Sequence, residues 1–148
     1  MKQIKHLGVY GLIVRNDKIV LIKKVGGPYD GKLDLPGGTI EWGETPEQTL
    51  IRELKEEAGI DVTKYELLDV DSVLLEWIHK GEVEFCQHIG IFYKILDYSN
   101  DLLENIEISC NNDDSKGAEY FDINSLNECD LSIIAILELK KMGYKFNK

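Results

Sequence analysis

Residues 38–60 read GTIEWGETPEQTLIRELKEEAGI, and they predict a helix whose two ends are both marked. Thr45 suits the cap position, Pro46 suits the first helical position, and Gln48 completes a capping box with Thr45. Gly59 predicts the end of the helix, because glycine readily adopts the left-handed conformation that closes many helices. We therefore expect a helix between Thr45 and Gly59.

The predicted helix has an apolar side and an acidic side. At about 100° per residue, the apolar residues that share one arc are Leu50, Ile51, Leu54 and Ala58. The acidic residues of the neighbouring arc, which we expect to be exposed at the edge of the core, are Glu53, Glu56 and Glu57. Like charges at these spacings destabilise a helix by roughly 0.2–0.5 kcal/mol per pair. One interpretation is a solvated acidic face. The other is a site for a hard divalent cation, which prefers carboxylate oxygens as ligands.

The same stretch resembles the signature of the Nudix hydrolases. Gly38 is followed by five residues and Glu44, and then by seven residues and the run RELKEEAGI at 52–60. In that run the sequence matches R-E-U-x-E-E-x-G-U, where U is apolar, at every defined position. The resemblance implies an α/β fold, specifically an α/β/α sandwich with a mixed β-sheet. It also implies an enzyme that hydrolyses phosphoric anhydride bonds.

The resemblance assigns roles to individual residues. The implied metal ligands are Glu53, Glu56, Glu57 and a backbone carbonyl near Gly38. Arg52 would orient the glutamates through its planar guanidinium, and Glu44 would support the geometry of the loop and helix. Glu53 is the first candidate for the general base. The alternatives, which lie on or near a later polar loop, are Asp113, Asp114 and Glu119.

Candidates for substrate binding are less strongly marked. Lys32 is a local cation that would contact phosphate, although a solvated surface lysine is the competing interpretation. Trp77 would stack on a nucleobase, although it also suits the rim of the core. Asp114 is expected to contribute from the polar loop. For Glu119 the competing interpretation is a solvated strand edge.

Outside the signature, the pattern predicts strands and one further helix. Two strands joined by a hairpin at 15–18 are expected at 8–14 and 19–23, and two longer strands at 65–78 and 83–95. We expect loop or turn structure with at most a short strand at 33–38, and a loop at 109–117. Asp130 or Ser132 would cap a last helix that ends near Met142.

Composition limits the classes of function. The chain has 148 residues, and we expect one domain spanning 1–148. Its net charge of −10 argues against binding to nucleic acid or to an anionic membrane. No apolar run approaches the ~20 residues of a membrane span, and the N-terminus lacks a signal-peptide core. The three cysteines are far apart, so we expect small apolar roles for them and a cytoplasmic location.

We therefore expect a Mg²⁺-dependent pyrophosphohydrolase, with Mn²⁺ able to substitute, that acts on a small phosphorylated nucleotide. A nucleoside triphosphate cleaved to the monophosphate and pyrophosphate is the first expectation. The alternatives are ADP-ribose or a nucleotide sugar, a dinucleoside polyphosphate, or a non-catalytic nucleotide sensor. Sensors of this kind often lose signature glutamates, and this chain keeps all of them. The oligomeric state is open between a monomer and a homodimer.

Overall fold

The computed structural model describes residues 2–99 and 115–146. Its strands are β1 (Lys2–Leu12), β2 (Val14–Arg15), β3 (Lys18–Lys24), β4 (Leu33–Asp34), β5 (Gly37–Thr39), β6 (Asp61–His79), β7 (Glu82–Ser99) and β8 (Ser115–Asp122). Its helices are α1 (Pro46–Ala58), α3 (Ile133–Lys141) and the 3₁₀ turns η2 (Ile123–Ser125) and η3 (Glu128–Asp130). Within the described ranges, no helix has the length and apolar character needed to cross a membrane.

The strands form two sheets, and one of them is mixed. In the first sheet the strand order is β5-β1-β7-β6. The β1–β7 pair is parallel, whereas β5 and β6 pair antiparallel to their neighbours. In the second sheet β3 pairs antiparallel with β2, β4 and β8. The expectation of a mixed sheet is confirmed.

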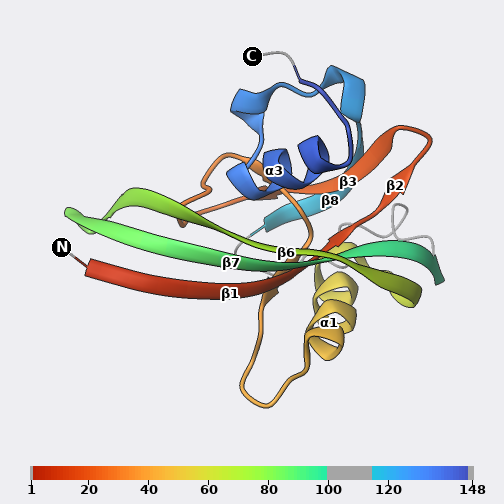
Figure 1. Ribbon diagram of the computed structural model, residues 1–148, viewed down its shortest axis with the longest axis horizontal. Coiled ribbons are helices and arrows are strands. Elements are labelled where there is room, and N and C mark those ends of the chain that lie inside the picture. The colour runs from red at the N-terminus through yellow and green to blue at the C-terminus, as the bar shows by residue number, and fades with distance from the viewer. Residues whose placement is uncertain (1, 100–114, 147–148) are drawn as a thin grey trace.

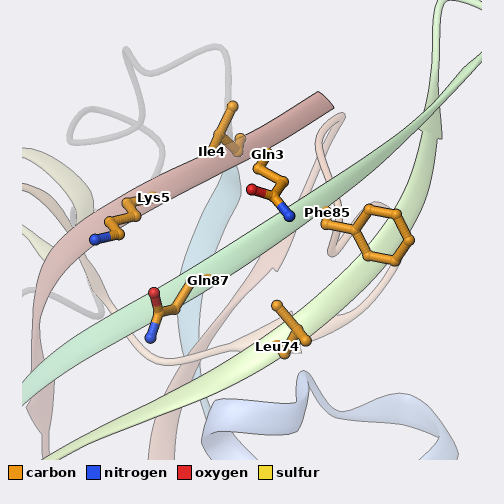
Figure 2. Close-up of a pocket in the computed structure, with 6 residues that line it drawn as sticks. All are labelled: Gln3, Ile4, Lys5, Leu74, Phe85 and Gln87. Atoms are coloured by element: carbon orange, nitrogen blue, oxygen red, sulfur yellow. The ribbon is translucent and has the colours of Figure 1, made fainter. Parts of the chain in front are cut away.

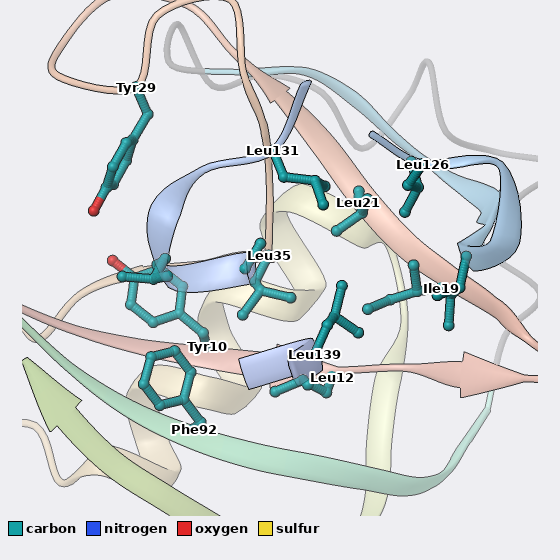
Figure 3. Packing of buried hydrophobic residues seen from close by; sticks show 13 residues of the cluster. Tyr10, Leu12, Ile19, Leu21, Tyr29, Leu35, Phe92, Leu126, Leu131 and Leu139 are labelled. Carbon is teal, nitrogen blue, oxygen red and sulfur yellow. The ribbon is translucent and has the colours of Figure 1, made fainter. Parts of the chain in front are cut away.

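The helices α1 and α3 lie on opposite sides of the strands (Figure 1). Leu50, Leu54 and Ala58 of α1 pack in one cluster with residues of β1, β3 and β7. A second cluster contains the buried residues of α3 together with Leu12 and Phe92 (Figure 3). Since a helix covers each side, the α/β/α arrangement implied by the signature is confirmed.

The turns follow the predicted chemistry, while the strands are longer than expected. Asn16 and Asp17 form the first hairpin turn with φ angles of 52° and 62°. Two residues at such angles match the twist of the flanking strands. The expected loop at 109–117 is wrong for 115–117, because these residues begin β8, which pairs with β3. The rest of that loop lies outside the described residues.

The ends of α1 confirm the local predictions. Thr45 and Gln48 form the capping box, and Gly59 closes the helix with a φ of 68°. Ile51 departs from the expected apolar arc, because its side chain is 43% exposed. The stripe that faces the core follows the i, i+4 spacing of Leu50 and Leu54, about 100° away from Ile51.

Two other expectations are resolved by the structure. The last helix begins after Ser132, whose hydroxyl accepts a hydrogen bond from the backbone N–H of Ala135, whereas Asp130 belongs to η3. Of the cysteines, Cys86 is buried as expected, but Cys129 is exposed. Both are free thiols.

Candidate active site

Two glycines bring the β5 backbone against α1. Gly37 pairs with Tyr10 and Gly38 with Val9 in the β1–β5 ladder. A Cβ at Gly37 would lie 2.1 Å from the carbonyl oxygen of Val9, so only glycine fits. A Cβ at Gly38 would lie 2.6 Å from the carboxyl carbon of Glu53. The two glycines therefore make room for carboxylates of α1 on the β5 backbone.

Glu57 is buried rather than exposed, which corrects the expectation of an open acidic face. Its side chain projects from α1 toward β5, and the residue is 1% exposed. One carboxylate oxygen, Oε1, accepts a hydrogen bond of 2.8 Å from the N–H of Gly37. The other, Oε2, is buried and has no hydrogen-bond partner among the described residues. Burial raises the pKa of Glu57 to about 8, and the hydrogen bond from Gly37 opposes that shift.

Glu53 lies one turn earlier and is also buried, at 7% exposed. Nη1 of Arg52 donates a 2.8 Å hydrogen bond to its Oε1. Burial raises the pKa of Glu53, and Arg52 opposes that effect. The negative charge of Glu53 also contributes to the raised pKa of Glu57. Two electrostatically coupled carboxylates thus meet the Gly37–Gly38 backbone.

Arg52 is fixed in place by Glu44, and this contact links the loop to the helix. Nε and Nη2 of Arg52 donate to the two carboxylate oxygens of Glu44 at 2.7 and 2.8 Å. Such a bidentate pair sets the plane of the guanidinium. The hydrogen bonds from Arg52 hold the pKa of Glu44 at about 2, and Glu44 also accepts from Thr49 and from the backbone of Glu41. Arg52 in turn donates to the carbonyl of Thr39.

Glu56 differs from the other two predicted ligands. Its side chain is 50% exposed, and its Oε2 lies 3.4 Å from Nη1 of Arg52. Within the part of the chain that the structure describes, no three His, Cys, Asp or Glu side chains are grouped so as to hold a metal ion. The structure therefore brings Glu53 and Glu57 together at β5 and leaves Glu56 on the outer side of the helix.

A cavity of about 230 Å³ is lined by residues from β1, β3, β4, β6 and β7, and the charges of two of them, Lys24 and Asp34, act on Glu57. Its polar lining includes Tyr10, Lys24, Tyr29, Asp34, Trp77 and His88. The two ring nitrogens of His88 make hydrogen bonds of 2.6 and 2.7 Å to the hydroxyls of Tyr10 and Tyr29. Burial lowers the pKa of His88 to about 3, so the ring is neutral near pH 7. A neutral ring has one donor and one acceptor, so His88 donates to one of the two tyrosine hydroxyls and accepts from the other.

Two further charged residues line this cavity: Lys24, one of the local cations that precede the signature, and Asp34, which was not singled out from the sequence. Asp34 is buried and accepts hydrogen bonds from the hydroxyl of Ser132 and the N–H of Leu35, and burial raises its pKa. The charge of Lys24 opposes the raised pKa values of both Asp34 and Glu57. Alternation along β3 could have identified Lys24, because it shares a side of the strand with Ile22, which packs toward α1.

The structure places the remaining predicted residues in different settings. Trp77 is half-buried and lines the cavity, and its Nε1–H donates to Glu84 at 3.2 Å. Lys32 donates to the backbone carbonyl of Cys129 and does not line the cavity. Glu119 is exposed on β8, and its neighbour Ala118 packs on the α1 side, so Glu119 points to the other side of the sheet. Their functional roles stay predictions. Asp113 and Asp114 lie outside the described residues.

Comparison with known proteins agrees with this fold. Residues 4–136 match the family model of the NUDIX domain, and the chain belongs to this family. Over 120 residues the chain is 36% identical to an ADP-ribose pyrophosphatase of Methanocaldococcus jannaschii. The match covers 81% of this chain and 63% of that protein. Over 97 residues it is 39% identical to an 8-oxo-dGTP diphosphatase of Escherichia coli K12, covering 63% of this chain and 67% of that protein.

Among solved structures, the chain is similar to a MutT NUDIX hydrolase from Burkholderia pseudomallei. The TM-score is 0.68 with 26% identity, and the match covers 92% of this chain and 96% of that one. A MutT protein from Bacillus halodurans has the same TM-score with 21% identity, covering 95% and 84% of the two chains, and supports the fold alone.

Proposed function

We propose that this protein is a metal-dependent pyrophosphohydrolase that cleaves a nucleoside diphosphate linked to another group. The observation that carries the proposal is the pair of buried carboxylates, Glu53 and Glu57, held against the Gly37–Gly38 backbone. Burying two carboxylates is costly unless a positive charge or hydrogen bonds compensate them. The burial of two carboxylates within the family signature is best explained by a cation that binds to them.

The donor atoms fit a hard divalent cation. Oε2 of Glu57 is buried without a partner among the described residues, and it belongs to the class of oxygen that Mg²⁺ prefers. We expect Glu53, Glu57 and the carbonyl near Gly38 to hold the ion. Glu56, one turn from Glu53 on the exposed side, would complete the set. Mn²⁺ takes similar oxygen ligands and would substitute.

The reaction is the attack of water on a phosphorus atom of the diphosphate. A bond forms between the water oxygen and phosphorus, the bond to the bridging oxygen breaks, and the leaving phosphate takes up the negative charge. Bound metal would neutralise the diphosphate and acidify the water. Glu53 would accept the proton of the water, because its carboxylate is fixed by Arg52. Lys24 would offset the charge of the substrate beside the cavity.

We assign the nucleoside end of the substrate to the cavity between Tyr10 and Trp77. Trp77 offers an aromatic face for stacking, and the pair of Tyr10 and His88 offers neutral hydrogen-bonding groups. A nucleoside triphosphate, cleaved to the monophosphate and pyrophosphate, is the first candidate substrate. ADP-ribose is the second, because the relative that matches 81% of this chain is named an ADP-ribose pyrophosphatase.

We further propose that the protein acts in the cytoplasm on small nucleotides rather than on nucleic acid. The net charge of −10 opposes association with a polyanion. A mononucleotide carries far less charge, and bound cations together with Lys24 would compensate it.

A product-release screen tests the proposal. The purified chain is incubated with nucleoside triphosphates, ADP-ribose, nucleotide sugars and dinucleoside polyphosphates, each with Mg²⁺ or Mn²⁺, and Glu57→Gln serves as the inactive control. The proposal expects turnover of at least one class that needs the metal and disappears in the variant. Nucleotide binding without cleavage of any class would indicate the sensor instead.

A further inference from the structure

The strand β6 forms an outer edge of the first sheet, and half of it is unusually regular. From Asp69 to His79 it pairs with β7 without a register shift, whereas shifts occur between Val62 and Asp69. In the described parts of the chain, β7 is the sole strand that pairs with β6. The backbone N–H and C=O groups on the other side of this stretch thus form an open edge, which is a template for pairing with another strand.

The side chains of this stretch alternate strictly between two environments. Odd-numbered residues such as Val73 and Leu75 are half-buried and pack on the core beneath α3. Val70, Leu74 and Ile78 project from the opposite side and are 56%, 72% and 72% exposed. Natural edge strands usually carry charges that prevent pairing. On this edge Lys141 of α3 pairs with Asp69 and Asp71, which leaves Glu76 as the charged residue among the exposed apolar side chains.

The exposed side of β6 continues into a shallow hollow across β7 and β1. Its volume is about 670 Å³, and it is lined by Gln3, Ile4, Lys5, Leu74, Phe85 and Gln87 (Figure 2). Leu74 lies at the boundary between this hollow and the open edge. Contiguous apolar surface of this kind marks a site of association more often than a solvated face.

The sequence of the edge is self-complementary about Leu74. Suppose that a second copy of the strand pairs antiparallel with the first, with Leu74 facing Leu74. The numbers of any two residues that face each other then add up to 148. Val70 then faces Ile78, and Leu74 faces Leu74 of the second copy. Ser72 faces Glu76, which accepts its hydroxyl hydrogen, and Asp69, which pairs with Lys141 of its own chain, faces His79. Residues that face each other across an antiparallel pair share one side of the sheet, so these contacts are side-chain contacts.

Other registers lack this agreement. A shift of two residues in either direction places Leu74 opposite Glu76 or Ser72, so the apolar contact at the centre is lost. A shift of one residue places inward-facing positions opposite outward-facing ones, which a pleated strand does not allow. A shift of four residues either places Glu76 opposite Glu76 or pairs only residues 69–75 of the regular stretch. Within the stretch 69–79, the apolar pattern therefore selects the register centred on Leu74.

We propose that two copies of this chain pair through β6, antiparallel and centred on Leu74, so that the first sheet continues from one copy into the other. The interface is isologous, because the same stretch supplies both sides. It includes Trp77, which lines the same cavity as Tyr10 and Lys24. The second copy would thus border that cavity. The pairing does not depend on the proposed hydrolytic activity.

Sedimentation equilibrium of the full chain tests the proposal. The unmodified protein is expected to sediment as a dimer, and Leu74→Asp to sediment at half that mass, because two like charges would then meet at the symmetry axis. Leu67→Asp is the matched control, since Leu67 is 60% exposed on the same strand but lies outside the paired stretch. A monomeric unmodified protein, or a dimer that resists Leu74→Asp, would overturn the proposal.

A cross-link tests the register directly and also covers the case in which Leu74→Asp does not fold. In a background of Cys110→Ser and Cys129→Ser, Leu74→Cys is expected to form an intermolecular disulfide under mild oxidation. Leu67→Cys in the same background should remain uncrosslinked. Efficient cross-linking through Leu67→Cys but not through Leu74→Cys would show a different interface and reject this one. A dimer in which the second copy lies face to face over the hollow at Phe85 would also reject the proposal.

Discussion

Glu57 shows how one residue of the signature combines stability and function. Its Oε1 closes a hydrogen bond to Gly37, while its Oε2 is enclosed without a partner among the described residues. A carboxylate in this setting lowers the stability of the fold unless a ligand compensates it. The proposed role of Glu57 as a metal ligand would explain this cost in stability.

For Glu57→Gln we expect turnover to fall about 100-fold or more, because several kcal/mol of transition-state stabilisation depend on the metal. The melting temperature without metal should be unchanged or higher, since an ionisable group leaves the interior. Magnesium should raise the melting temperature of the unmodified protein but not of the variant. Glu66→Gln, at an exposed position of β6 outside the stretch proposed to pair, is the control. Equal turnover in the two variants would contradict the assignment of Glu57.

The two adjacent glycines are expected to respond differently to the same substitution. In Gly38→Ala the new methyl group meets the end of the Glu53 side chain, which can move, so activity should fall while the fold persists. In Gly37→Ala it meets the backbone carbonyl of Val9, which cannot move without disrupting the β1–β5 pair. Urea unfolding and turnover measured on both variants test this difference. Similar losses of stability in the two would refute it.

At the scale of elements, one side of α1 packs in the core and a neighbouring side carries the buried carboxylates. Leu50, Leu54 and Ala58 fix the helix in the core, and the neighbouring side delivers Glu53 and Glu57 to β5. The capping box at Thr45 and the contacts of Arg52 with Glu44 set where the helix begins relative to the loop. These contacts fix α1 on the loop that precedes it, and thereby help to position Glu53 and Glu57 at β5.

We expect Leu54→Ala to lower the free energy of unfolding by about 2–5 kcal/mol, because the residue is fully buried and a cavity would remain. Ile51→Ala, at a position that is 43% exposed, should cost less than about 1 kcal/mol. Chemical denaturation monitored by circular dichroism measures both. Turnover per folded molecule of Leu54→Ala should stay near that of the unmodified chain. A larger cost at Ile51 than at Leu54 would show that the packing of α1 is misassigned.

At the scale of the whole molecule, a cluster of charges joins the C-terminal helix to the first sheet. Nζ of Lys141 on α3 lies 2.6 Å from a carboxylate oxygen of both Asp69 and Asp71 on β6. Glu138 lies beside this cluster, fully buried, and neither of its carboxyl oxygens accepts a hydrogen bond from the described residues. Burial and the neighbouring Asp69 raise the pKa of Glu138 to about 8, although Lys141 opposes the shift.

This arrangement predicts a stability that falls as the pH rises from about 4.5 toward 8. Between these values the unfolded chain releases the proton of Glu138 while the folded chain keeps it, so a rise in pH favours the unfolded state. Glu138→Gln should flatten that dependence. Urea unfolding at several pH values in this interval measures it, and the exposed Glu76→Gln should leave the slope unchanged. An identical slope in Glu138→Gln would refute the role of Glu138.

Local features of the sequence were sufficient for the elements around the signature. The start of α1, its end at Gly59 and the hairpin at Asn16–Asp17 depend on capping and turn preferences of residues that are close in the chain. The strand β8 was missed in part, because the polar residues at its start carry no alternating pattern. It is a strand because β3 offers it an edge to pair with.

The sequence by itself therefore determined the helix that carries the signature, through its capping residues, and it indicated the family and the fold class through the resemblance of residues 38–60 to the signature. Only the tertiary structure decided that Glu57 is buried, that Lys24 lies by the cavity and that His88 is held by Tyr10, 78 residues away. Burial and long-range contacts depend on which surfaces meet when the sheets and helices pack. No local pattern encodes that information.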